Sequence, residues 1–437
     1  FVKMNKLNPG QNNGSLIFAL PIELAPLFTL LNLYLIEINM KKFFSLIPFF
    51  FLHNLTHADW LNFRGSHGNG EASIRSISQL SNTSPTSWKA TLPGRGLSSP
   101  ILFQDKVYIT ASRGPKQESL HILCFPQDQG ELEWERKFKA TGRTICHEKT
   151  CVAAPTMTSD GEVVIAQFSS NDVFCLDLKG ELIWLRGLTY DFPNAANGLG
   201  MSSSPVITQG VVIAQAEHDA DSFTTGSDIK NGMSIWTNTR PKGANWTSPV
   251  LLGSGKKQKV ALQSKNGISI INPKTGDEFW SFDEGASTIP SSTPIGEILL
   301  VPSNGMIALK GRIDQKSHTQ LWQDNKLGPG TGSPTISGDY FLVINKANVL
   351  TCAQITTGEI LWRMRIKGPS SGSPIATSSH LYFFNEDGLG QVIEINRNEG
   401  KLVSSIDLEE TILCTPAISE KALYVRSDRH LWRLSGN

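Results

Sequence analysis

The sequence predicts an all-β fold, an eight-bladed β-propeller whose blades are four-stranded antiparallel sheets. A small residue followed by proline recurs eight times, and successive prolines lie 40 to 55 residues apart, close to the length of a propeller blade. The 38 glycines and 10 tryptophans are typical of many short strands joined by tight turns. The eight pairs are Ser99-Pro100, Ala154-Pro155, Ser204-Pro205, Ser248-Pro249, Thr293-Pro294, Ser333-Pro334, Ser373-Pro374 and Thr415-Pro416.

One clear copy of the repeat, residues 337–366, reads SGDYFLVINKANVLTCAQITTGEILWRMRI. It divides into a strand over residues 340–344, a turn, a second strand over 349–354, a Thr-Thr-Gly turn and a third strand that carries Trp362. The strand that begins after Pro334 is the fourth. Each repeat therefore supplies one four-stranded blade.

A glycine four residues before a tryptophan is the second recurring signal. Glycine provides the positive φ of a tight turn, and a tryptophan at a fixed distance can fill the wedge between adjacent blades. Two copies depart, because His318 stands four residues before Trp322 and the seventh copy has no tryptophan. The tryptophans that we expect to dock blades together are Trp88, Trp134, Trp184, Trp236, Trp280, Trp322 and Trp362.

The small residue and proline mark the start of each innermost strand, where a missing N–H costs little. The alternative is that the hydroxyls of Ser99, Ser204 and Ser248 line a ligand channel. The last copy ends after three strands, and Trp88 precedes Pro100 by the same 12 residues that separate other tryptophans from their next proline. We therefore expect the N-terminal segment to close the last blade.

The first 97 residues divide into three predicted segments. Residues 40–58, MKKFFSLIPFFFLHNLTHA, resemble a signal peptide cut after Ala58, and residues 1–39 are interpreted as upstream sequence from an over-long gene model, with a transmembrane helix as the alternative. Residues 59–97 are an N-terminal segment that includes the blade-closing strand, and 98–437 form the propeller. We expect a periplasmic or secreted monomer with no stable membrane span in the mature chain.

Charge and cysteine usage limit the function classes. Forty Lys and Arg balance 39 Asp and Glu, which does not indicate a nucleic-acid partner. Cys146 and Cys151 flank HEKT in one long loop, where they either form a local disulfide or stay free. His147 beside this lone pair gives too few ligands for zinc, so no metal site is predicted.

Two loops between the predicted outer and inner strands are long, and they hold most of the candidate binding residues. Trp134 to Pro155 and Trp184 to Pro205 each span 21 residues, and loops at one face of a propeller commonly bind ligands. Their polar residues also suit turns alone. No catalytic residue is assigned. The ligand-binding candidates are Arg143, His147, Asp191, Asn194, Asn197, Arg240, Asn245 and Trp246.

The chain resembles the PQQ-like (pyrroloquinoline-quinone-like) β-propeller repeat family over residues 60–437. IINPKTGDEFW and CAQITTGEILW match the blade-docking pattern of that family, and longer stretches such as WLNFRGSHGNG and YDFPNAANGLGMSSSPV are similar to its exported planctomycete-type branch.

The resemblance implies two kinds of function. Quinoprotein dehydrogenases of the family hold PQQ and Ca2+ beneath a disulfide between adjacent cysteines, and this sequence has no Cys-Cys pair and no C-x-x-C-H haem motif. BamB-like members are non-catalytic scaffolds. We therefore expect a binding or scaffold propeller without a cofactor that docks a protein, small ligand or glycan. A PQQ- and Ca2+-dependent oxidoreductase and a carbohydrate-binding or polysaccharide-processing accessory are the alternatives.

Overall fold

The computed structural model describes residues 59–195, 198–311 and 315–436. The predicted upstream segment and signal peptide lie outside the described residues. No helix in the described part of the chain is long and apolar enough to cross a membrane.

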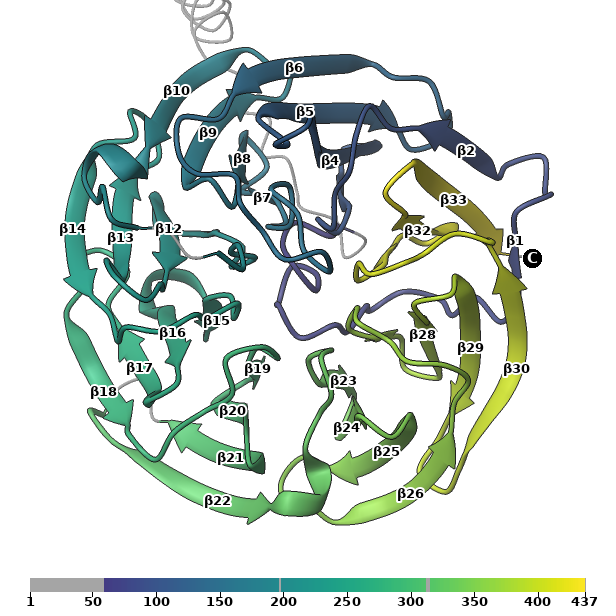
Figure 1. Ribbon diagram of the computed structural model, residues 1–437. Coiled ribbons are helices and arrows are strands. Elements are labelled where there is room, and N and C mark those ends of the chain that lie inside the picture. Colours follow the sequence, from purple (N-terminus) through teal and green to yellow (C-terminus); the bar gives the residue numbers. More distant parts are fainter. Residues whose placement is uncertain (1–58, 196–197, 312–314, 437) are drawn as a thin grey trace, which may run out of the picture. The chain divides into compact units, whose positions relative to one another are not determined.

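Eight antiparallel sheets are arranged in a ring, which confirms the predicted fold (Figure 1). Seven of them are built from consecutive strands, the innermost first in sequence. Blade 1 consists of β3 (Ile101–Phe103), β4 (Lys106–Arg113), β5 (Ser119–Pro126) and β6 (Trp134–Lys139), and blade 2 of β7 (Thr158–Ser159), β8 (Val163–Gln167), β9 (Asp172–Asp177) and β10 (Leu182–Gly187). Blade 3 consists of β11 (Val206–Thr208), β12 (Val211–Ala216), β13 (Phe223–Asp228) and β14 (Ser234–Thr239), and blade 4 of β15 (Val250–Leu252), β16 (Lys259–Ser264), β17 (Gly267–Ile271) and β18 (Glu278–Phe282). Blade 5 consists of β19 (Thr293–Ile295), β20 (Ile298–Ser303), β21 (Gly305–Gly311) and β22 (His318–Asp324), blade 6 of β23 (Thr335–Ser337), β24 (Tyr340–Ile344), β25 (Val349–Gln354) and β26 (Ile360–Arg365), and blade 7 of β27 (Ile375–Ala376), β28 (His380–Phe384), β29 (Leu389–Ile395) and β30 (Gly400–Asp407). Short 3-10 helices are η1 (Leu188–Tyr190), η2 (Gly255–Lys257) and η3 (Asn325–Leu327).

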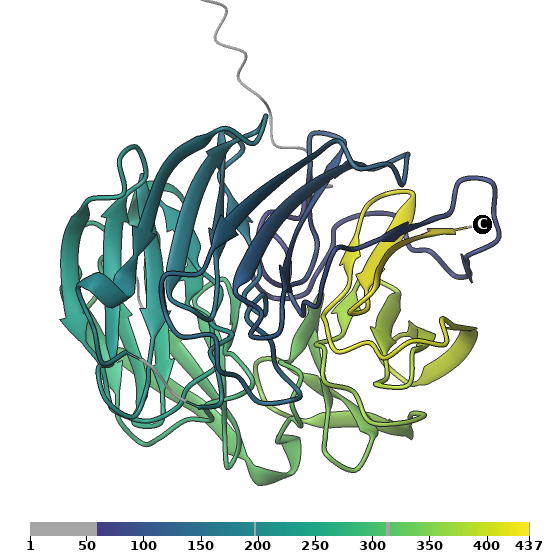
Figure 2. The ribbon, with the colours of Figure 1, turned by 45° about the horizontal axis from the view of Figure 1, so that its top comes forward.

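Blade 8 joins the two ends of the propeller. Its inner strands are β31 (Ala417–Ile418), β32 (Ala422–Arg426) and β33 (His430–Gly436), and the N-terminal strands β2 (Trp88–Thr91) and β1 (Leu80–Ser81) both pair with β33. Figure 2 shows these N-terminal strands beside the C-terminal one. The predicted closure by the N-terminal segment is confirmed, and it leaves no open seam in the ring.

The predicted tryptophans contact a glycine of the following blade. Trp322 of blade 5 lies over Gly358 of blade 6, so close that a Cβ on that glycine would stand 2.7 Å from the indole. The Nε1 of Trp322 donates a 2.8 Å hydrogen bond to the carbonyl of Ile355 in the same turn. The equivalent pairs are Trp88 and Gly130, Trp134 and Gly180, Trp184 and Gly232, Trp236 and Gly276, Trp280 and Gly311, and Trp362 and Gly400.

The departure at His318 has a physical reason. The ring of His318 lies 4.8 Å from the ring of Trp280, the tryptophan of the preceding blade. His318 and its cross-strand partner Gly311 therefore cover that indole together, where most other blades present a turn glycine.

Residues 60–71 form an N-terminal plug that lies across one end of the central channel (Figure 1). Trp60 bridges to Leu102 of blade 1, and Glu71 bridges to Ala376 of blade 7. Between these points the fully buried Arg64 donates hydrogen bonds to the Ser292 carbonyl, 3.2 Å away, and to the Thr293 hydroxyl, 2.7 Å away. The plug therefore connects blades on opposite sides of the ring.

Candidate functional site

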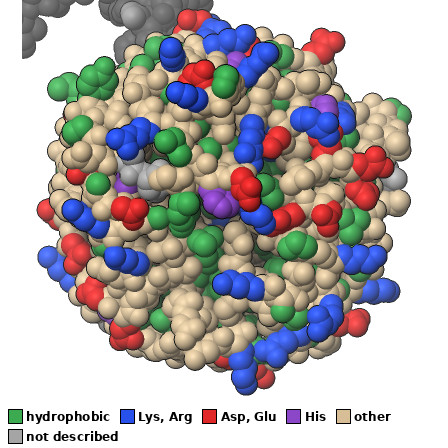
Figure 3. Space-filling view, viewed as in Figure 1, with side chains coloured by type: hydrophobic (Ala, Val, Ile, Leu, Met, Phe, Trp, Pro, Cys, Tyr) green, Lys and Arg blue, Asp and Glu red, His purple; other side chains and the backbone are tan. Residues whose placement is uncertain are grey.

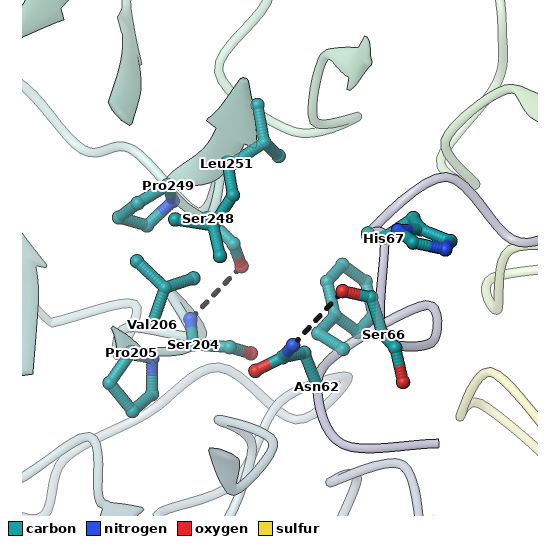
Figure 4. Close-up of a pocket in the computed structure, with 12 residues that line it drawn as sticks. Asn62, Ser66, His67, Ser204, Pro205, Val206, Ser248, Pro249 and Leu251 are labelled. Carbon is teal, nitrogen blue, oxygen red and sulfur yellow. Dashed lines mark hydrogen bonds between the residues drawn. The ribbon is translucent and has the colours of Figure 1, made fainter. Parts of the chain in front are cut away.

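Eight buried hydroxyl side chains form a ring around the channel, one from each blade. The backbone N–H of each residue donates to the side-chain oxygen of the next, at 2.9 to 3.0 Å, in seven successive blade-to-blade contacts. Figure 4 shows the contact from Ser204 to Ser248. Each residue is at most 4% exposed. This hydroxyl ring consists of Ser99, Thr156, Ser204, Ser248, Ser291, Ser333, Ser373 and Thr415.

The hydroxyl ring forms the wall of a central cavity of about 520 Å³, a volume within the range of small-ligand sites. Phe63 of the plug lies at one end, and Figure 4 shows the plug residues Asn62 and Ser66 close to Ser204. All eight connections from an outer strand to the next inner strand supply lining residues at the other end. The cavity is thus open toward the loops and obstructed by the plug.

An ion pair joins two loops of different blades at the cavity mouth. Lys149, from the long loop between blades 1 and 2, lies 3.0 Å from Glu386 of blade 7. Burial raises the pKa of Glu386, but the hydrogen bonds from Ser371 and Lys149 outweigh burial and hold the pKa below its usual value. Glu386 is therefore ionised and already has two donors.

Two of the sequence-predicted candidates, His147 and Trp246, line the cavity. Arg143 is exposed and does not line it. Asp191 forms an ion pair with Arg186, and the exposed Asn194 donates its backbone N–H to Asp221. Asn197 lies outside the described residues.

Arg240 and Asn245 instead belong to a buried polar network. Arg240 lies 2.8 Å from the carboxylate of Glu217, and Asn245 donates to the same group at 2.9 Å. Burial raises the pKa of Glu217, while Arg240 and then Asn245 act in the opposite direction. Since the side chains of Arg240 and Glu217 are only 8% and 1% exposed, these contacts hold blade 3 to its following loop.

The six cysteines are free thiols in the structure, so no disulfide joins Cys146 to Cys151. Cys151 is fully buried, and burial raises its pKa to about 12. Cys146 is half-buried, and its sulfur lies 3.4 Å from the side-chain amide of Gln117. No group of three or more potential metal ligands is found within the described ranges.

Four exposed apolar side chains lie in the connecting loops, and two of them, Leu199 and Ile289, line the cavity. Ile145 is 65% exposed, Tyr190 is 86% exposed, and Leu199 and Ile289 are 42% and 48% exposed. All four lie in connections between an outer strand and the next inner strand. Figure 3 shows basic and acidic side chains interspersed over one face, without a broad field of one sign.

Sequence reasoning missed several residues of the cavity. Lys149 and Glu386 are 237 residues apart, and no local pattern connects them. The ring residues Thr156 and Ser291 lie two positions from Ala154 and Thr293, the small residues that precede the repeat prolines. The only available signal was the recurrence of Ser and Thr beside each proline.

Comparisons with known proteins agree with this architecture. A family model described as outer membrane protein assembly factor BamB matches residues 79–199, 194–289 and 309–403. The crystal structure of BamB from Moraxella catarrhalis has a TM-score of 0.59 at 15% identity, covering 80% of this chain and 98% of that one. A comparison with curated protein sequences finds no match.

Two dehydrogenase structures are similar in fold. A europium-containing methanol dehydrogenase has a TM-score of 0.65 at 9% identity, covering 87% of this chain and 98% of that one. The quinohemoprotein alcohol dehydrogenase from Comamonas testosteroni has a TM-score of 0.66 at 11% identity, covering 87% and 81%. At these identities the likeness shows a shared propeller.

The lining of the cavity does not fit PQQ held with Ca2+. Ca2+ takes six to eight oxygen ligands, commonly from several carboxylates and amides. Among the described residues that line the cavity, Glu386 is the only carboxylate, and it is bound by Lys149 and Ser371. No adjacent cysteines are present.

Proposed function

Because the chain belongs to the BamB family of PQQ-like β-propellers, we propose that it is an exported, non-catalytic scaffold that docks a protein partner on its loop-rich face. The observation that carries this proposal is the set of exposed apolar residues in the loops: Leu199 and Ile289, which line the cavity, and Ile145 and Tyr190 in the two long loops. Large apolar side chains exposed beside a cavity are typical of an interaction site.

The loops are well suited to present this surface. The backbone N–H of His147 donates to the carbonyl of Leu199, 3.1 Å away, so the two long loops support each other. Lys149 ties the first of them to blade 7 through Glu386. A rigid scaffold that positions surface loops is the common arrangement for binding sites.

Photo-crosslinking tests the proposed face. A photoreactive residue is placed at Tyr190 or Ile289 in the full-length protein, and at Leu402 of the outer strand β30 as the control, which is 40% exposed. We expect one defined protein adduct from the two loop positions, lost on Trp246→Ala, and none from position 402. Equal adducts at all three positions, or adducts only at 402, would refute the docking face.

A quinone-dependent oxidoreductase is the second candidate, favoured by the fold shared with the two dehydrogenases. It requires Ca2+-dependent binding of PQQ, which the scaffold proposal does not. Titration of the protein with PQQ, with and without Ca2+, separates these functions.

A further inference from the structure

We infer that the central cavity receives the C-terminal carboxylate of a partner polypeptide whose last side chain is apolar. This inference rests on the proposed docking function and specifies which part of the partner enters the cavity. Three features carry it: the hydrogen-bond donors of the wall, the apolar surface around them, and the plug at the far end.

The wall offers donors that have no acceptor. Seven ring oxygens, from Thr156 to Thr415, each accept one backbone N–H. A Ser or Thr hydroxyl also donates one hydrogen bond and rotates to do so, and none of these seven donates to another group within the described residues. Because all seven residues line the cavity, a ligand bound there can accept from their hydroxyls.

The mouth adds an aromatic side chain, Trp246, and one cation, Lys149. The ammonium group of Lys149 is 62% exposed beside its partner Glu386, so it can turn toward a second carboxylate. The carboxylate of Glu386 is already bound. A carboxylate suits such a site, since charge-assisted hydrogen bonds are about twice as strong as neutral ones. A sugar, which brings as many donors as acceptors, would leave donors unpaired.

The remaining lining fits an apolar side chain. Phe63, Leu97, Leu199, Ile289 and Leu413 line the cavity together with Trp246. An apolar terminal residue would bury its side chain against this surface, which stabilises binding by about 25 cal/mol per Å² of apolar area removed from water.

The plug explains why a chain end is required. Arg64 and the two bridges at Trp60 and Glu71 hold the plug across the channel, so an extended chain entering from the loops cannot pass through. An N-terminus would bring an ammonium group to a wall of donors. A C-terminus brings two acceptor oxygens, a recognised mode of peptide capture.

Calorimetry with matched peptides tests the inference. N-acetylated hexapeptides that end in Phe, Leu or Val are titrated into the protein as free acids and as C-terminal amides. We expect at least one free acid to bind about tenfold or more tightly than its amide, as expected from the loss of a charge-assisted hydrogen bond. Equal affinity of every acid and amide, or no binding by any of the acids, would overturn the inference.

Charge variants of Ile289, an exposed residue that lines the cavity, test whether the group bound there is a carboxylate. Ile289→Lys should tighten the acid by about twofold to fivefold and Ile289→Glu should weaken it similarly. The matched change Ile235→Glu, on the outer strand of blade 3, should have no effect. If Ile289→Lys and Ile289→Glu bind the acid equally, or Ile235→Glu weakens it as much as Ile289→Glu, the assignment to this cavity is wrong.

Two further results separate related explanations. If N-acetylphenylalanine binds and no peptide acid does, the cavity holds a free small carboxylate and the polypeptide assignment is overturned. Crosslinking at Tyr190 reports docking independently, since Tyr190 does not line the cavity. If no protein adduct forms at Tyr190, the proposed function is refuted. If an adduct forms but no peptide binds, only this inference is refuted.

Discussion

Replacing Gly358 by alanine tests whether the tryptophan contacts hold adjacent blades together. Gly358 has φ of +71°, and an added Cβ would stand 2.7 to 2.8 Å from the indole of Trp322. Backbone strain at positive φ costs about 1 kcal/mol. Crowding in a packed site costs about 1 to 3 kcal/mol more. Part of this cost arises because a displaced indole would weaken its hydrogen bond to the carbonyl of Ile355. We therefore expect Gly358→Ala to lower the free energy of unfolding by about 3 kcal/mol.

Gly338 supplies a matched control in the same blade. Its φ is +58°, but nothing lies within 4 Å of an added Cβ, so Gly338→Ala should cost only the backbone strain, about 1 kcal/mol. Guanidinium unfolding of both variants and the parent protein measures the difference. If Gly358→Ala proves no more destabilising than Gly338→Ala, the indole contact does not stabilise the blade junction and the reasoning fails.

Three further predictions concern buried groups. Burial lowers the pKa of His218 to about 4, so the unfolded chain binds the proton first as the pH falls below 6.5. The free energy of unfolding should therefore drop by about 2 kcal/mol between pH 7 and pH 5. In guanidinium titrations, His218→Asn should reduce this pH dependence. Arg240→Ala leaves the carboxylate of Glu217 buried without its cation and should cost about 3 kcal/mol or more in the same assay. A maleimide should label Cys146 alone in the native protein and six thiols after denaturation without reductant; four thiols would indicate a disulfide to Cys151.

The controls use other positions. Lys137→Ala removes an ion pair to Glu135 whose cation is 63% exposed, and it should change stability by less than about 1 kcal/mol. A loss equal to that of Arg240→Ala would contradict the role given to burial. For the pH experiment, an unchanged slope in His218→Asn would assign the acid sensitivity to other groups.

The fold could be predicted because its signals are local and repeated. Nearly every blade has a turn glycine, a tryptophan at a fixed distance from it and a proline before the innermost strand. One irregular copy therefore does not change the predicted fold. Closure by Trp88 followed from the same spacing. The plug carries no repeat signal, and only the structure shows that Arg64 lies at the channel.

The site was harder to predict because its residues come together from distant blades. Arg240 and Asn245 looked like ligand contacts, but the buried partner Glu217 precedes them by more than 20 residues. In blade 5 a second proline, Pro290, precedes the ring residue Ser291, so the repeat pair Thr293-Pro294 does not mark the ring position. The shift is two residues, which keeps the side chain on the same face of an extended chain.

The most direct test of the account is calorimetric titration of residues 59–437 with PQQ in the presence and absence of Ca2+. If the cavity lacks a set of Ca2+ ligands, PQQ should release the same heat with and without the metal, or no heat in either titration. Saturable binding that requires Ca2+ would contradict the account and identify the protein as a quinone-dependent enzyme.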